Sequence, residues 1–165
     1  MSDSARRQIL VEVGEILFAA DARDVREVME PTVATPVPGA VPGVLGLINR
    51  RGKVIVAGEL GTFLGLSLQR GDEAALVVFA EGNRRIALEV DRVVGIAPYS
   101  TTGLDVESDL LDALGAREVV AGVGRFGLRP YFQLDVPALF ARVLEQTGEP
   151  DRSIQTGSTG GQDQQ

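Results

Sequence analysis

The chain has 165 residues, a hydrophobic fraction of 44% and a formal net charge of −7, which is the size and composition of one folded domain. It contains no cysteine and no histidine, so disulfides, thiolate chemistry and the commonest general base are excluded, and zinc loses its preferred ligands. The acidic charge opposes binding to nucleic acid, and without an apolar run of about 18 residues or a signal-peptide centre we expect a cytoplasmic protein with no direct membrane insertion.

The first predicted element is a β-hairpin over residues 8–20. Ile9, Val11 and Val13 recur at every second position, and the same spacing resumes after Gly14-Glu15. A period of two is typical of strands and places these side chains on one buried face. The glycine supplies the turn between the two arms.

A short helix is predicted next, over residues 22–29. Asp21 has the side chain of a helix N-cap, and Val25, Val28 and Met29 form an apolar stripe at helical spacing. We interpret this stripe as core packing, and we expect the helix to end at the following proline.

The remainder of the chain is predominantly β in pattern. Four prolines between residues 31 and 42 predict an extended loop. Predicted strands then follow on both sides of a polar turn within 44–56, and at 75–80, 85–90, 91–97, 118–123 and 129–134, with helical segments at 60–66, 110–114 and 136–146. Many short strands favour β-barrels, and two small barrels suit about nine or ten strands better than one large barrel.

Two motifs suggest ligands but have simpler explanations. Residues 122–127, GVGRFG, match the dinucleotide-binding pattern, yet a strand follows where the mechanism requires a helix N-terminus, so we interpret them as a hairpin turn. The acidic stretch from Asp105 to Asp112 lacks the spacing and central glycine of a calcium loop and is interpreted as a solvated loop. We therefore predict no catalytic, cofactor-binding or metal-binding residue.

The segment from Gly46 to Leu60, GLINRRGKVIVAGEL, carries the most specific signal. Its Asn-x-Arg-Gly motif, Asn49–Gly52, and its acidic-Leu pair, Glu59-Leu60, resemble the corresponding segment of the CheW family, the coupling proteins of bacterial chemosensory arrays. Weaker landmarks follow in the family's order: Val25–Val28, Val90-Asp91 with Val93, Val120–Val123 and Gln133–Asp135. Three positions depart from the family pattern: Arg50 where leucine is common, Val56 where proline is usual, and Gly58 where an apolar residue is usual.

This resemblance implies a mainly all-β fold over residues 8–146, with two small SH3-like β-barrels, short helices and a C-terminal helix. Residues 147–165 have no apolar face and are expected to form a disordered tail. The family's function implies a non-catalytic adaptor at membrane-associated chemosensory arrays. One barrel would bind the regulatory domain of a CheA-type histidine kinase, and the groove between the barrels would bind the cytoplasmic tip of a methyl-accepting chemoreceptor.

The resemblance also implies which residues meet the partners. The candidates are Val25, Glu27, Val28, Asn49, Arg51, Gly52, Val56 and Glu59. Residues 45–66 belong to the barrel expected to meet the kinase, whereas 25–27 and 49–52 lie nearer the expected receptor groove. An ion pair is expected between Glu27 and Arg51, whose planar fork suits a carboxylate. The alternative is a small ligand-binding or hydrolytic β-barrel protein, which would need a concave pocket with convergent polar groups.

Overall fold

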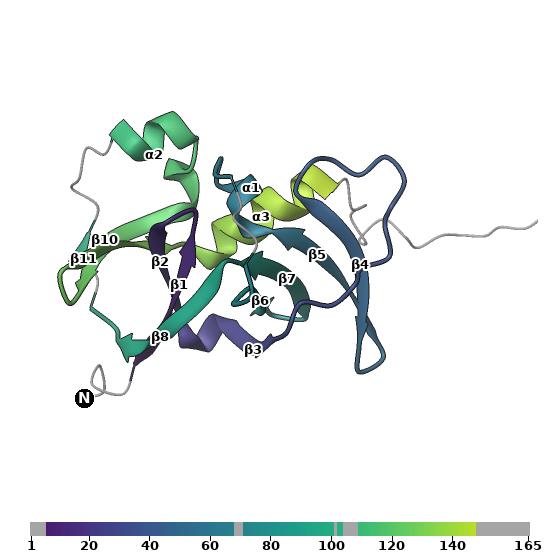
Figure 1. The fold of residues 1–165 in the computed structure, drawn as a ribbon, viewed down its shortest axis with the longest axis horizontal. Helices are drawn as coiled ribbons and strands as arrows, with labels where there is room; N and C mark the ends of the chain where they lie inside the picture. Colours follow the sequence, from purple (N-terminus) through teal and green to yellow (C-terminus); the bar gives the residue numbers. More distant parts are fainter. Residues whose placement is uncertain (1–5, 68–70, 101, 104–108, 148–165) are drawn as a thin grey trace, which may run out of the picture.

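The computed structural model describes residues 6–67, 71–100, 102–103 and 109–147 (Figure 1). Its described part contains eleven strands in two sheets. The strands are β1 (Arg7–Val13), β2 (Ile16–Asp21), β3 (Val25–Met29), β4 (Val44–Arg50), β5 (Lys53–Glu59), β6 (Ala75–Glu81), β7 (Arg84–Val90), β8 (Arg92–Pro98), β9 (Thr102–Gly103), β10 (Val120–Phe126) and β11 (Arg129–Leu134). The helices are η2 (Ala22–Asp24) and η3 (Arg117–Val119), both 3-10, and α1 (Leu60–Phe63), α2 (Asp109–Leu114) and α3 (Val136–Thr147).

The first sheet, barrel A, has the strand order β8-β1-β2-β11-β10-β9. Its two edge strands are consecutive in the chain, because β8 leads through Tyr99 and Ser100 toward β9. The hydroxyl of Tyr131, on β11, donates to the carbonyl of Ser100 and so ties this connection to the middle of the sheet. The sheet is thereby curled toward closure, as small barrels require.

The second sheet, barrel B, has the order β3-β6-β7-β5-β4. After β3 the chain continues along the loop to Thr35, which pairs with Leu47 of β4 through two backbone hydrogen bonds of 2.8 and 2.9 Å. This pairing joins the two edges of the sheet, so the proline-rich loop has the structural role of closing barrel B.

Barrel B is inserted into barrel A, because β3–β7 lie in the chain between β2 and β8. Asp91 stands at the return from barrel B to barrel A. Its carboxylate accepts a 2.7 Å hydrogen bond from the backbone N–H of Gly14, and its own N–H donates to the carbonyl of Glu12 at 3.0 Å. The resemblance gave Asp91 as a landmark, and the structure shows that it fixes the β1–β2 hairpin beside the crossing point of the chain.

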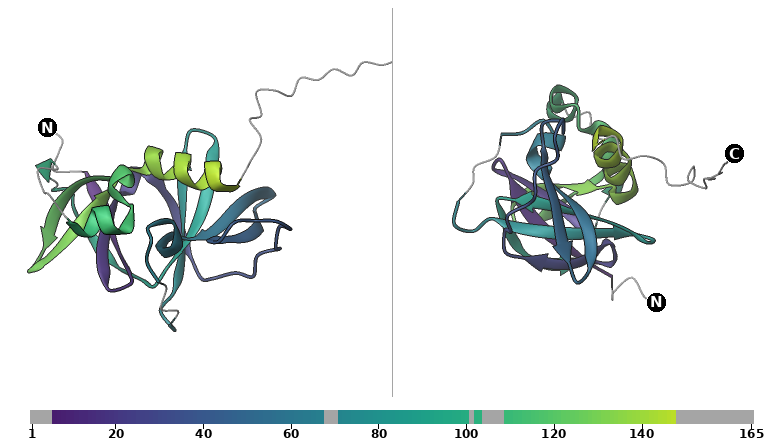
Figure 2. Two further views of the ribbon diagram at one scale, coloured as in Figure 1. Left: turned by 90° about the horizontal axis from the view of Figure 1, so that it is seen from above. Right: turned by 90° about the vertical axis from the view of Figure 1, so that its right-hand side faces the viewer.

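Three apolar clusters fill the molecule. One cluster lies inside each barrel, around Tyr131 in barrel A and around Ile48 in barrel B. The largest cluster lies between the barrels and includes Phe18, Phe79 and Phe140. Because α3 contributes to this shared core, it lies across the junction of the two barrels (Figure 2). The barrels therefore form one packed unit, with strands buried on both faces.

The helix predicted over residues 22–29 is wrong. Only η2 is helical, with the Asp21 side chain accepting from the N–H of Arg23 as a cap should, and β3 follows directly. A β-bulge between Val25 and Glu27 adds one residue to the strand. Val25 and Val28 consequently share a face although they are three positions apart, which reproduces helical spacing inside a strand.

The other predictions of secondary structure are confirmed within the described residues. The hairpins, the proline-rich loop, the short helix α1 and the long helix α3 lie where expected. The glycine-rich motif is the β10–β11 hairpin, with Gly127 at φ +63° in its turn. Of the tail predicted over residues 147–165, Thr147 ends α3 and the rest lies outside the described residues. Of the acidic stretch, residues 105–108 also lie outside them, and residues 109–112 belong to α2.

The fold gives a prediction for Tyr131, which is 2% exposed inside barrel A. Its hydroxyl accepts a 2.7 Å hydrogen bond from Nε2 of the fully buried Gln8 and donates to Ser100. Tyr131→Phe should lower the free energy of unfolding by about 1–2 kcal/mol, because buried polar partners lose their hydrogen bonds. Urea unfolding checks this value. Tyr99→Phe is the matched control at the partly buried second tyrosine, and equal effects of the two changes would contradict the prediction.

Candidate protein-binding surface

The two edge strands β3 and β8 bring part of the shared core to the surface. Val28 on β3 is paired with the buried Val77, and Ile96 on β8 is paired with the buried Ile9. Paired residues in antiparallel strands project from the same face of a sheet. Both side chains therefore point to the side of the shared core, yet Val28 is 43% exposed and Ile96 is 61% exposed.

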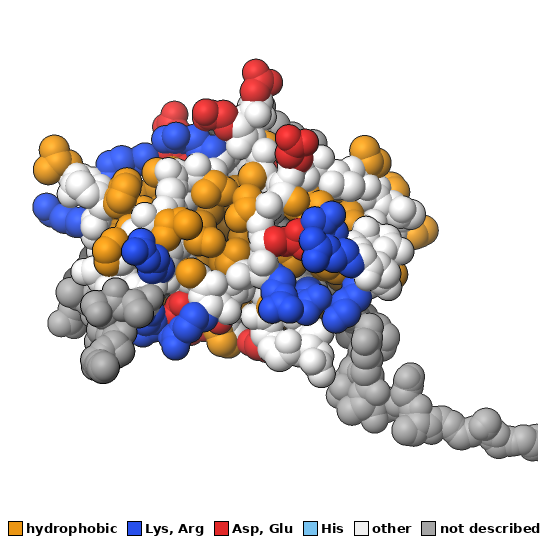
Figure 3. All heavy atoms as spheres, turned by 90° about the horizontal axis from the view of Figure 1, so that it is seen from below, with side chains coloured by type: hydrophobic (Ala, Val, Ile, Leu, Met, Phe, Trp, Pro, Cys, Tyr) orange, Lys and Arg blue, Asp and Glu red, His pale blue; other side chains and the backbone are white. Residues whose placement is uncertain are grey.

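We call this area the inter-barrel surface and define it by Val25, Val28, Val93 and Ile96. Val25 and Val93 are partly buried and pack against the shared core. Figure 3 shows hydrophobic side chains gathered across the middle of the face that carries β3 and β8, with basic side chains next to them at the barrel B end. Exposed apolar patches rimmed by charge are typical of protein-binding sites.

The polar turn of the sequence is a two-residue β-hairpin between β4 and β5. Arg51 and Gly52 have φ values of +53° and +80°, and Arg50 is paired with Lys53, which is the geometry of a type I′ turn. The side chain of Asn49 accepts a 3.1 Å hydrogen bond from the N–H of Gly52. The asparagine and the glycine of the motif therefore act in the turn itself.

The ion pair at this turn joins Glu27 to Arg50, so the predicted pairing with Arg51 is wrong. Nη2 of Arg50 lies 2.7 Å from Oε1 of Glu27, and Nε lies 3.2 Å from the same atom. Alternation along β4 puts Arg50 on the same face as Ile48, toward the inside of barrel B, and the register puts Glu27 opposite Val78 of the same interior cluster. Arg51, one residue further, is exposed in the turn.

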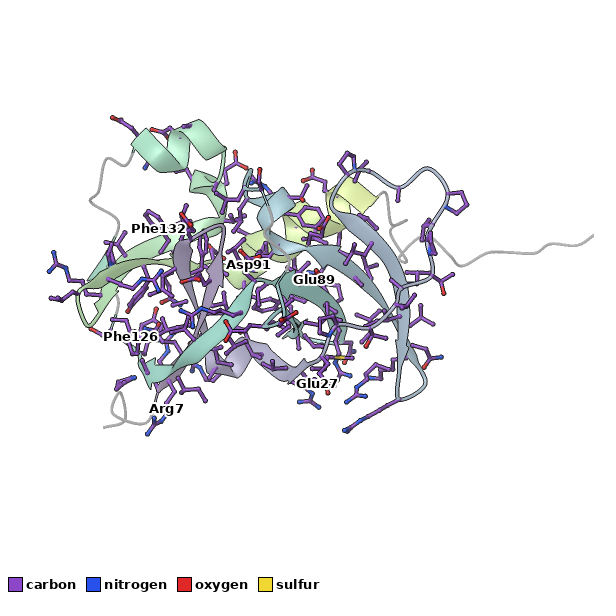
Figure 4. The ribbon with its side chains drawn as sticks, in the orientation of Figure 1. Arg7, Glu27, Glu89, Asp91, Phe126 and Phe132 are labelled. Carbon is purple, nitrogen blue, oxygen red and sulfur yellow. The ribbon has the colours of Figure 1, made fainter. Side chains whose placement is uncertain are left out.

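This pair also joins the two edge strands of barrel B. Glu27 lies on β3 and Arg50 at the end of β4, and these strands are not neighbours in the sheet. Figure 4 shows Glu27 beneath β3, on the side of the β4–β5 hairpin. The hydrogen bond from Arg50 lowers the pKa of Glu27, and the charges of Arg51 and Arg85 lower it further. The carboxylate is therefore held ionised at the closing seam of the barrel.

The predicted site residues fall into three places. Val25 and Val28 lie on the inter-barrel surface. Glu27, Asn49, Arg51 and Gly52 lie at the hairpin end of barrel B. Val56, on the middle of β5, is partly buried, and Glu59 ends β5, at the opposite end from the turn. The structure therefore does not gather all eight residues into one site.

Sequence reasoning missed two contributors. Ile96 was assigned only to a strand, although its apolar side chain near the end of that strand was a weak signal. Arg50 was noted as a departure from the family pattern, and that departure was the signal: an arginine at an inward-facing position of a strand needs a carboxylate.

The carboxylates that bind arginine give a pH prediction. Hydrogen bonding, chiefly from Arg92, lowers the pKa of Glu12, which also lies 2.9 Å from Arg129, and Arg50 lowers that of Glu27. A folded-state pKa below the unfolded value means that both groups stabilise the fold above the unfolded pKa of about 4.5 and lose this effect as pH falls through the folded value. Unfolding free energy should therefore decline below about pH 4.5.

Urea titrations across that range measure the decline. Glu12→Gln and Glu27→Gln should flatten it, because each removes one group that takes up a proton on unfolding. Glu145→Gln, at an exposed position on α3, is the matched control. Curves of equal steepness for all three variants would contradict the assignment.

Among the described residues, none of the helices has the length and the apolar composition that a membrane-spanning segment needs.

Comparison with known proteins places these features in context. Residues 7–144 match the model of the CheW-like domain. The chemotaxis protein CheW of Thermotoga maritima is 26% identical over 137 residues, which cover 83% of this chain and 89% of that protein. The chemotaxis protein CheW of Rhizobium meliloti is 32% identical over 130 residues, covering 76% and 83%. The crystal structure of scaffolding protein TtCheW from Thermoanaerobacter tengcongensis has a TM-score of 0.69 and 20% identity, covering 78% of this chain and 88% of that one.

Proposed function

The chain belongs to the CheW-like domain family, and we propose that it is a non-catalytic adaptor that couples a CheA-type histidine kinase to methyl-accepting chemoreceptors. A role as a chemotaxis scaffold follows from the family and its relatives. The two partners, and the assignment of a surface to each, are the proposal. A small ligand-binding or hydrolytic barrel is not favoured, because the chain lacks the histidine and cysteine that most often carry such chemistry.

The inter-barrel surface is the observation that carries the receptor assignment. Val28 and Ile96 continue the shared core onto the outside of two edge strands. Neither β3 nor β8 has a strand on its outer side among the described residues. An apolar strip of this kind suits the apolar face of an amphipathic helix of a partner, and it lies between the barrels, where the family resemblance places the receptor groove. We therefore assign this surface to the receptor.

The outer face of β4 and β5 is assigned to the kinase. Val54 is 66% exposed and Val56 is partly buried, and both alternate with Ile55, which points into barrel B. This face lies on different strands from the inter-barrel surface. An adaptor must hold both partners at once, and two separate apolar faces allow that.

Binding measurements test the proposal directly. The purified protein is titrated with the regulatory domain of a CheA-type kinase and, separately, with the cytoplasmic tip fragment of a chemoreceptor from the same genome. We expect binding to each, and a ternary complex when both are present. Failure to bind either partner, with a normal unfolding curve, would refute the adaptor function. Competition between the two partners would refute the assignment of separate surfaces.

A further inference from the structure

One end of barrel B is positively charged although the chain as a whole carries 16 basic and 23 acidic residues. Four basic residues, Arg50, Arg51, Lys53 and Arg85, lie at the hairpin end of barrel B, where Glu27 also lies. The charges of three of them, Arg50, Arg51 and Arg85, act on the Glu27 carboxylate, and Lys53 is paired with Arg50 across the hairpin. We call these four residues the basic mouth. Figure 3 shows basic side chains gathered at this end of the face, beside the apolar band.

The position of the basic mouth follows from strand alternation. Ile48, Ile55 and Ala87 fill the inside of barrel B. Arg50 and Arg85 are two residues from Ile48 and Ala87 on the same strands, so they project from the same, inner face of the sheet, at its hairpin end. The interior of barrel B is therefore apolar in its middle and is lined by guanidinium groups at its hairpin end.

The positive charge of the basic mouth is not neutralised by the described residues. Glu27 is engaged by Arg50 through both Nε and Nη2. Arg51 is exposed, and no ion pair is described for it or for Lys53. Nε of Arg85 is buried and has no hydrogen-bond partner among the described residues. The neighbouring carboxylate of Glu81 is paired with Arg84, so the four cations of the basic mouth exceed the one charge of Glu27 and leave a surplus that an anionic group can satisfy.

We propose that the basic mouth binds carboxylates on an acidic segment of the same partner that lies on the inter-barrel surface. This inference rests on the proposed function for the identity of that partner. Arginine is suited to carboxylates because its planar fork donates to both oxygens. The next residue after Glu27 is Val28 of the inter-barrel surface, so one segment could meet both areas. The occupant is then an amphipathic helix with acidic side chains beside its apolar face.

A nucleic acid or an anionic membrane fits this arrangement less well. Both present many phosphates, and a protein of net charge −7 repels such polyanions outside a small cationic area. The apolar side chains next to the basic mouth would also lack partners on a phosphate backbone. A protein segment of mixed character matches both the charge and the apolar neighbours.

The test measures affinity for the receptor tip fragment at low and high salt. Arg51→Glu and Lys53→Glu should each weaken binding about fivefold at low ionic strength, with the difference largely lost at about 0.5 M salt, because exposed charges are screened. Arg125→Glu, an equal charge change at an exposed position on β10 of barrel A, is the matched control and should have no effect. Affinity for the kinase domain should be unchanged in all three variants.

Each other outcome overturns the inference in a distinguishable way. Normal receptor binding by Arg51→Glu and Lys53→Glu would refute the basic mouth and leave the proposed function standing. If the wild-type protein binds no receptor fragment, the proposed function fails, and a synthetic glutamate-rich amphipathic peptide then probes the mouth alone. If the peptide does not bind, or if it binds equally well to the wild-type protein and to Arg51→Glu, the basic mouth is refuted. If inorganic phosphate displaces the receptor fragment, or if the protein binds anionic vesicles more strongly than the fragment, the basic mouth is a site for phosphate groups rather than for protein carboxylates, and the inference is refuted.

Discussion

Replacing Gly46 by alanine should lower the free energy of unfolding by about 3–5 kcal/mol, since it combines a forbidden backbone angle with a steric overlap. Gly46 has φ +137°, a conformation that side chains rarely permit, and an added Cβ would overlap the carbonyl oxygen of Thr35. That same oxygen accepts the hydrogen bond from Leu47 that closes barrel B. The substitution therefore disrupts the Thr35–Leu47 pairing that closes barrel B.

Urea unfolding of the variant measures the loss. Gly39→Ala is the matched control, because Gly39 also has a positive φ, +78°, but has nothing within 4 Å of an added Cβ. It isolates the cost of the backbone angle, which should be about 1 kcal/mol. If both variants lost the same free energy, the close approach of Thr35 to β4 would not contribute to closing the barrel.

The role of Gly46 also shows what the sequence could not predict. Its place in a recognisable motif was visible, but the reason for it depends on Thr35, eleven positions earlier, returning to β4. Hairpins are set by neighbouring residues and were predicted correctly, as for the turns at Gly14 and Gly52. Barrel closure depends on residues far apart in the chain, and local patterns carry little information about it.

The error over residues 22–29 has the same kind of cause. Apolar residues spaced three and four positions apart indicate a helix only when a strand would alternate regularly, with every second side chain on the same face. The bulge between Val25 and Glu27 breaks that regularity, and it is stabilised by pairing with β6, more than fifty residues later. The tertiary pairing with β6 therefore overrides the local preference.

The candidate site was predictable in its composition but not in its contacts. The family resemblance identified Glu27 and the arginine-rich turn as neighbours, and the structure places them together. The resemblance selected Arg51 as the partner of Glu27, which is wrong, because the choice between Arg50 and Arg51 depends on which residue ends β4 and which enters the turn. With Arg51 and Gly52 as the two turn residues, Arg50 is the last residue of the strand and faces inward. The arginine of the family motif is thereby left exposed in this chain.

Replacing Val28 by aspartate should weaken binding to the receptor tip about thirtyfold while leaving affinity for the kinase domain within about threefold. An apolar anchor at the centre of a small interface commonly contributes on the order of 2 kcal/mol, which corresponds to that change in affinity. Val28 is 43% exposed on an edge strand, so the variant should fold. Val33→Asp, at a 95% exposed position in the proline-rich loop, is the matched control and should bind both partners normally.

Ile96→Asp extends this test across the inter-barrel surface, because Ile96 lies on the other barrel and is 61% exposed. Titration of each variant against each partner, with an unfolding curve as the folding control, separates the two surfaces. If the receptor helix spans both edge strands, Val28→Asp and Ile96→Asp should each weaken receptor binding, and neither should affect the kinase. Equal loss of both partners in a folded Val28→Asp variant would mean one shared site. Simultaneous coupling through separate surfaces would then be impossible, and the mechanism would be wrong.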